Sequence, residues 1–268
     1  MGAREAADFA GGNRRMGQLA TSYRARSTVS DHASTENTFS DSVMRLLDRI
    51  DCRPAETDAE REAIFRLRYQ AYVRDGSIVP GPSGTFSDPY DEKGNVFLLG
   101  AYLDGRLASS IRLHIASREH PICPSLDVFP DILQPELDAG KILVDPTRFA
   151  TDPELARVER GLPYVTTRLC GMAARYFKAD HLLAAVRAEH QAFYRRIFNH
   201  QQICEARSYP LLAKPITLMT IHYPTVSEQV HRRFPFFQST FVERRALFER
   251  RPAEPASGHR IGVAADAL

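Results

Sequence analysis

Two long β-prone runs flank the dipeptide Asp104-Gly105, and this hairpin signal constrains the fold more than any other feature of the sequence. Asp-Gly is typical of tight turns whose twist matches that of paired antiparallel strands. We therefore predict two antiparallel strands, over Val96–Leu103 and Arg106–Ala116.

A helix is expected before this hairpin, over about residues 57–73. Thr57 is a suitable N-cap residue, and Glu60 follows three positions later, as a capping box requires. Apolar positions then recur at helical spacing to about Val73. Residues 74–95 are rich in Gly, Pro and Asp and are too many for an ordinary connection, so we expect a functional loop there.

The remaining elements alternate between strand and helix. Residues 117–140 look like a Pro-rich connection. The strand candidates are 49–53, 141–149, 181–187 and 216–223, and the helix candidates are 162–178 and 189–198. The order β-α-β-β-β-α-β-α-β predicts an α/β (α+β) protein with a central mixed sheet flanked by helices.

Both ends of the chain differ in composition from its middle. Residues 1–40 are rich in small and polar residues and lack apolar periodicity, so we predict a flexible leader, a domain over 41–250 and a flexible tail over 251–268. No signal peptide is recognisable, and no apolar run approaches the ~18 residues that span a bilayer. We expect a cytoplasmic protein, with at most weak contact between its scattered arginines and a membrane surface.

Charge and cysteine content exclude several classes of function. The 35 Lys and Arg against 33 Asp and Glu give a net charge of +2, so no global field calls for nucleic acid. The four cysteines are widely spaced and contain no C-x-x-C pair. This spacing argues against a disulfide framework or a zinc site and fits a reducing compartment, so we expect no metal.

Four short motifs follow one another along the middle of the chain. They are RYQAYV at Arg68–Val73, DPYD at Asp88–Asp91, SSIRL at Ser109–Leu113 and VDPTRFA at Val144–Ala150. In this order they resemble the first helix, the D-x-Y-D loop and two strands of long-chain N-acyl amino acid synthases and the related acyl-homoserine lactone (autoinducer) synthases. The resemblance covers about residues 45–225 and implies a GNAT-like acyl-N-acyltransferase fold.

Two departures favour the N-acyl amino acid synthase branch. The chain has no tryptophan, and Asp145 stands where lactone synthases usually carry glutamate. The resemblance then implies transfer of a long-chain fatty acyl group from acyl-carrier protein to the α-amine of an amino acid. Two alternatives stay open: a lactone synthase that uses S-adenosylmethionine, and a non-catalytic module of the same fold that binds acyl-carrier protein or lipid.

The implied reaction needs a base, because only an unprotonated amine attacks a thioester. Asp88, Asp91 and Asp145 are the candidates, although an aspartate with an ordinary pKa near 4 must act through water or have its pKa raised by burial. Asp145 could instead pair with an arginine of the sheet. In the wider acyltransferase fold a tyrosine at the position of Tyr194 protonates the leaving thiolate; the alternative is a packed aromatic ring.

Binding roles are expected for arginines in the motifs. Arg68, Arg112 or Arg148 could hold the α-carboxylate of the acceptor through a planar guanidinium, with Phe149 beside them. The alternative is that their stems only pack on the sheet. The sequence predicts that these arginines and the three aspartates converge on one pocket.

The expected donor is the acyl-phosphopantetheine of acyl-carrier protein, with no bound cofactor. Residues 157–163 contain one glycine and one proline, which makes a poor cradle for the pyrophosphate of coenzyme A. Arg168, Arg175 and Lys178 share one stripe of the predicted helix and are candidates for carrier-protein docking. The alternative is an ordinary solvated basic face.

Overall fold

The computed structural model describes residues 38–209 and 214–249. The predicted tail lies outside these residues, and so does the predicted leader except for 38–40. Residues 38–41 are helical and belong to a separate N-terminal unit. The unit that carries the sheet begins at Ser42 and opens with helical residues 42–47.

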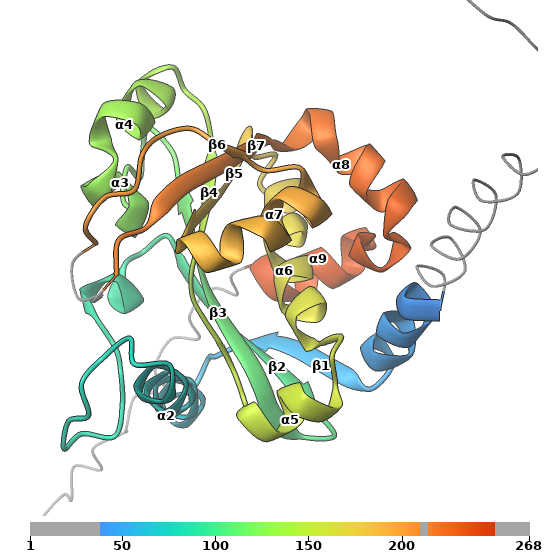
Figure 1. Cartoon of the computed structure of the whole chain (residues 1–268). Helices are drawn as coiled ribbons and strands as arrows, with labels where there is room; N and C mark the ends of the chain where they lie inside the picture. Colours follow the sequence, from blue (N-terminus) through green and yellow to red (C-terminus); the bar gives the residue numbers. More distant parts are fainter. Residues whose placement is uncertain (1–37, 210–213, 250–268) are drawn as a thin grey trace, which may run out of the picture. The chain divides into compact units, whose positions relative to one another are not determined.

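A seven-stranded mixed sheet forms the centre of this unit, with strand order β1-β2-β3-β4-β5-β7-β6 (Figure 1). β4 and β5 are parallel, and every other neighbouring pair is antiparallel. The strands are β1 (Ile50–Pro54), β2 (Val96–Leu103), β3 (Arg106–Ala116), β4 (Leu143–Thr151), β5 (His181–Val186), β6 (Gln201–Gln202) and β7 (Thr217–His222). The predicted mixed sheet is confirmed.

Local signals in the sequence placed the first elements well. The hairpin turn has positive φ at both Asp104 (50°) and Gly105 (83°), and the two flanking strands have the predicted bounds. Helix α2 (Asp58–Arg74) begins at the predicted capping box, in which the Thr57 side chain accepts from the Glu60 backbone.

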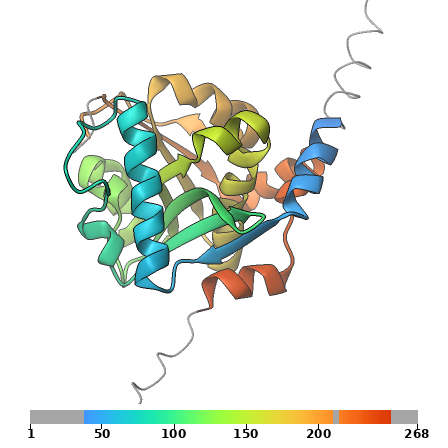
Figure 2. The same cartoon turned by 90° about the horizontal axis from the view of Figure 1, so that it is seen from below.

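Helices cover both faces of the sheet. Figure 1 shows α2 with α3 (Pro124–Val128) and α4 (Pro130–Asp138) on one side, and α6 (Leu162–Tyr176) on the other. Figure 2 shows α2, in cyan, with the strands behind it. The remaining helices are α5 (Pro153–Val158), α7 (Gln191–Phe198), α8 (Tyr223–Arg233) and α9 (Phe241–Phe248), with short 3-10 turns η1 (Pro89–Glu92), η2 (Ala188–His190) and η3 (Pro235–Phe237).

The predicted Pro-rich connection over 117–140 is wrong in part, because α3 and α4 lie within it. Each of these helices starts with a proline, Pro124 or Pro130, at a position where the missing N–H costs nothing. Their apolar side chains, among them Phe129 and Leu133, pack on the sheet in one buried cluster. No helix in the described part of the chain is long and apolar enough to cross a membrane.

Two irregularities in β4 shape the functional region. β4 pairs with β5 only at Leu143 and Val144, and beyond these residues the two strands part. Between the pairs Ser110–Ala150 and Arg112–Thr147, β4 has two residues where β3 has one. This β-bulge places Arg148 at a φ of 55° and re-aims its side chain.

Candidate active site

Three arginines and two aspartates of the motifs form one buried ion-pair network. Arg68 Nη1 donates to Asp91 Oδ1 at 2.8 Å. Arg112 Nη1 lies 2.6 Å from Asp88 Oδ1 and 3.1 Å from Asp91 Oδ1. Arg148 donates to Asp88 Oδ2 through Nε (3.0 Å) and Nη2 (2.7 Å). The structure therefore brings together residues that lie far apart along the chain.

Hydrogen bonds within the DPYD loop fix both carboxylates, in addition to their pairing with the arginines. Asp88 caps η1 and accepts from the Tyr90 backbone N–H at 2.9 Å. Asp91 returns the contact, since its Oδ2 accepts from the Asp88 backbone N–H at 2.9 Å. Such a reciprocal capping box fixes both side chains by local geometry.

The charge on Asp88 is stable at neutral pH. Burial acts to raise its pKa, but hydrogen bonds and charge from Arg112 and Arg148 outweigh burial and lower the pKa to about 2. An ionised carboxylate this acidic accepts no proton from an amine. Its contribution is to hold Arg148 in place at the bulge.

Asp145 has a different environment. It is fully buried and accepts from Ser125, at 2.9 Å from the backbone N–H and 2.8 Å from the hydroxyl. Burial raises its pKa, against the lowering effects of Ser125 and Arg112. Within residues 38–209 and 214–249 no ion pair joins Asp145 to an arginine, so its direct partner is the start of α3 rather than the expected guanidinium.

A cavity of about 620 Å³ opens where β4 and β5 part. Its lining comes from both sides of the sheet: Tyr72 of α2 on one side, and Thr167 of α6 and Tyr194 of α7 on the other. Arg148 and Phe149 of the bulge lie between them. Of the predicted site residues, these two and Tyr194 line the cavity, whereas Arg68, Arg112 and the three aspartates lie behind it.

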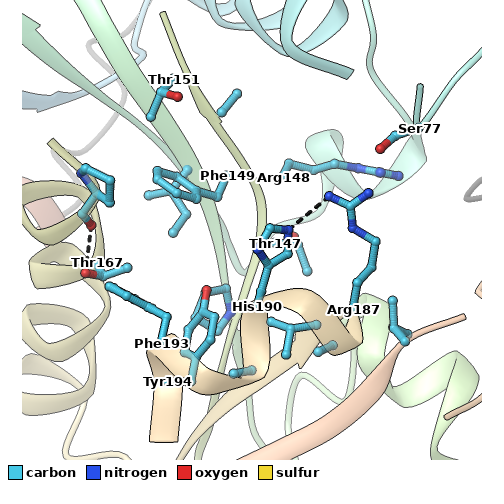
Figure 3. A pocket seen from close by; sticks show the side chains of 18 of the residues that line it. Ser77, Thr147, Arg148, Phe149, Thr151, Thr167, Arg187, His190, Phe193 and Tyr194 are labelled. Carbon is cyan, nitrogen blue, oxygen red and sulfur yellow. Dashed lines mark hydrogen bonds between the residues drawn. The ribbon is translucent and has the colours of Figure 1, made fainter. Parts of the chain in front are cut away.

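The two ends of the cavity differ in character. Figure 3 shows Phe149 and Phe193 towards one end and the guanidinium groups of Arg148 and Arg187 towards the other, near Ser77. Carboxylates of Asp75, Asp88 and Glu189 pair with three of the basic residues that line the cavity. The charged residues of the lining itself are four basic and one acidic. They are Arg74, Asp75, Arg148, Arg187 and Lys214.

Tyr194 lies on α7, which follows β5 and the short turn η2. Burial raises the pKa of its hydroxyl well above the usual value, so the group keeps its proton at neutral pH. Tyr194 packs edge-on against Phe193, with ring centroids 5.2 Å apart, and the two rings line the cavity together. A protonated hydroxyl in this position is a hydrogen-bond donor and a potential acid.

The expected exposed stripe on α6 is wrong at Arg168. Its guanidinium is buried, donates to the Gln238 carbonyl at 3.1 and 2.7 Å, and pairs with Glu243 Oε1 at 2.7 Å. The cause is α9, a helix that the sequence did not predict and that packs on α6. Arg175 and Lys178 are exposed, and their docking role stays a prediction.

Residues 157–163 offer little room for a phosphate. A Cβ at Gly161 would lie 2.9 Å from Leu46 Cδ2 and 3.3 Å from Val43 Cγ2, so this glycine faces packed side chains. In the described part of the chain, no group of three or more His, Cys, Asp or Glu side chains is arranged to hold a metal ion.

Comparison with known proteins agrees with the geometry. A family model described as "N-acyl amino acid synthase FeeM" matches residues 63–222. The structure of FeeM, from uncultured soil microbes, is 18% identical with a TM-score of 0.57, over 69% of this chain and 97% of that one. The structure of BjaI, a CoA-dependent acyl-homoserine lactone synthase, is 15% identical with a TM-score of 0.52, over 70% of this chain and 89% of that one. At these identities the structures show a shared GNAT-like fold; no curated protein sequence matches.

Proposed function

Since the chain belongs to the family of the N-acyl amino acid synthase FeeM and is an N-acyltransferase, we propose that it moves a long-chain fatty acyl group from acyl-carrier protein to the α-amine of an amino acid. The observation that carries this proposal is the cavity between β4 and β5. Its apolar end suits an acyl chain, and its basic end suits an anionic acceptor.

The bulge marks the place of reaction. A bulge leaves its extra residue out of the strand ladder, so backbone groups near Arg148 are available to the thioester carbonyl. The amine nitrogen attacks this carbonyl carbon and forms a tetrahedral oxyanion; the carbon–sulfur bond then breaks. Tyr194 gives its proton to the departing thiolate, and the nitrogen loses one proton as the amide forms, which restores the proton of Tyr194 directly or through water.

The three aspartates do not take the proton from the acceptor amine, because none of them lines the cavity. The basic residues of the lining favour the unprotonated amine instead. The positive charges of Arg187 and Lys214 disfavour a bound ammonium group and lower its pKa, an effect that their pairing with Asp75 and Glu189 weakens. The acceptor therefore binds as a free amine and releases its proton to water. Asp88 positions Arg148, Asp91 pairs with Arg68 and Arg112, and Asp145 holds the start of α3.

Acyl-carrier protein is the proposed donor because residues 157–163 form a poor cradle for the pyrophosphate of coenzyme A. Gly161, the glycine at the N-cap of α6, faces Leu46 and Val43, and Pro163 removes one backbone donor. A carrier protein brings its own phosphopantetheine and needs only a docking surface. Arg175 and Lys178, exposed near the end of α6, are part of that proposed surface.

A direct test offers the purified protein both donors. Long-chain acyl-carrier protein and long-chain acyl-CoA are incubated separately with a mixture of the twenty amino acids and S-adenosylmethionine, and products are identified by mass. We expect N-acyl amino acids, formed faster from the carrier protein. Equal rates with both donors would contradict the donor assignment. Formation of an acyl-homoserine lactone would show that S-adenosylmethionine, and not an amino acid, is the acceptor.

A further inference from the structure

Arg187 carries a positive charge at the basic end of the cavity and belongs to none of the four motifs. It follows β5 directly, at the point where this strand has parted from β4. Its side chain is 17% exposed and lines the cavity. Arg148 lines the same cavity, and Figure 3 shows both guanidinium groups towards one end of it, although Arg148 comes from β4 and Arg187 from the turn after β5.

The neighbours of Arg187 hold its guanidinium in a fixed orientation. Nη2 lies 2.8 Å from Asp75 Oδ2 and donates to His190 Nε2 at 3.0 Å, and Nε lies 3.3 Å from Glu189 Oε1. His190 Nε2 accepts this bond and so carries no proton. Burial and the charge of Arg187 lower the pKa of His190, which keeps the imidazole neutral.

Each of the two arginines retains one donor group for a ligand. Arg148 contacts Asp88 through Nε and Nη2, and Arg187 uses the same two nitrogens for its neighbours. Among the described residues, neither Nη1 group has a hydrogen-bond partner. Both arginines line the same cavity, and a carboxylate has two oxygens, one for each Nη1 group.

The position also fits the chemistry of the acceptor. In an α-amino acid the carboxylate carbon and the amine nitrogen share one α-carbon. A carboxylate at Arg148 therefore places the amine beside the bulge, where the thioester carbonyl is expected. An amine without a carboxylate has no such anchor and loses orientation as well as affinity.

We infer that Arg187 and Arg148 together bind the α-carboxylate of the acceptor, and that Arg187 restricts the acceptor to free amino acids. This inference rests on the proposed function. Arg187 is the residue to test, because Arg148 also belongs to the buried ion-pair network.

The experiment compares three acceptors with long-chain acyl-carrier protein as donor: the amino acid that is acylated best, its primary amide and its decarboxylated amine. For the unaltered protein we expect kcat/KM to be about 10- to 100-fold higher for the amino acid than for the amide or the amine. Arg187→Met should raise the KM for the amino acid by a similar factor and leave kcat/KM for the amide and the amine within about threefold. The preference for a carboxylate then disappears.

Arg196→Met is the matched control, since Arg196 is an exposed arginine of α7 that does not line the cavity. It should keep the full preference. If Arg187→Met does not fold, Arg187→Lys retains the charge without the planar fork and should show an intermediate preference. A preference that survives in the Arg187 variant, or that falls equally in the control, overturns the inference. No acylation of any acceptor by the unaltered protein overturns the proposed function itself.

Discussion

Replacing Arg112 by leucine is expected to lower the free energy of unfolding by about 3–5 kcal/mol. The Arg112 side chain is fully buried and lies between the carboxylates of Asp88 and Asp91. Without it, Asp91 keeps only Arg68 and Asp88 keeps only Arg148, and the buried Asp145 loses the nearby positive charge of Arg112. Buried negative charge in excess of its partners is costly, because water no longer solvates it.

Arg106 provides a matched control on the same strand, β3. It also contacts two carboxylates, Asp152 at 2.6 Å and Glu154 at 2.9 Å, but its side chain is 54% exposed. Arg106→Leu should therefore change the free energy of unfolding by no more than about 1 kcal/mol. Urea unfolding of both variants measures the difference. A loss for Arg112→Leu as small as that for Arg106→Leu would show that the network contributes little to stability.

Replacing Cys170 by phenylalanine should lower turnover of long-chain donors by at least about 100-fold, because the ring occupies the cavity that the acyl chain needs. Cys170 lies on α6, lines the cavity and is nearly fully buried. A larger side chain here shortens the space beside Tyr194 and Phe193. Short acyl chains should be affected much less, so the preferred chain length shifts downwards.

Initial rates with carrier proteins that bear acyl chains of increasing length measure this shift. Cys170→Ala serves as the control, since it enlarges the cavity slightly and should keep long-chain turnover within about threefold. Overpacking costs about 1–3 kcal/mol, so thermal unfolding of both variants confirms that they fold. Undiminished use of long chains by the phenylalanine variant would mean that the acyl group lies elsewhere.

Elements with a local cause were predictable from the sequence. The Asp104-Gly105 turn and the Thr57 capping box depend on residues within a few positions, and both are present as expected. Helices α3 and α4 were missed because proline ends helices in most contexts, and only the sheet beneath shows that Pro124 and Pro130 start them.

The part of the site that lies within the four sequence motifs was predictable from the sequence. The DPYD loop, β3 and β4 brought their arginines and aspartates together, but which carboxylate pairs with which guanidinium depends on tertiary structure. Arg168 was misjudged because α9, which covers it, gave no signal that was recognised. Arg187 was missed because a single arginine at the end of a strand has no local pattern.

Transfer of an acyl group to an α-amine creates a carbon–nitrogen bond that isotope labelling detects directly. Carrier protein loaded with a long-chain acyl group labelled with ¹³C at the carbonyl is incubated with the protein and ¹⁵N-labelled amino acid. The product should show a one-bond ¹³C–¹⁵N coupling at its amide carbonyl. If the ¹³C label is recovered only in free fatty acid, in an oxygen ester or in unreacted thioester, without this coupling, the chain does not make N-acyl amino acids.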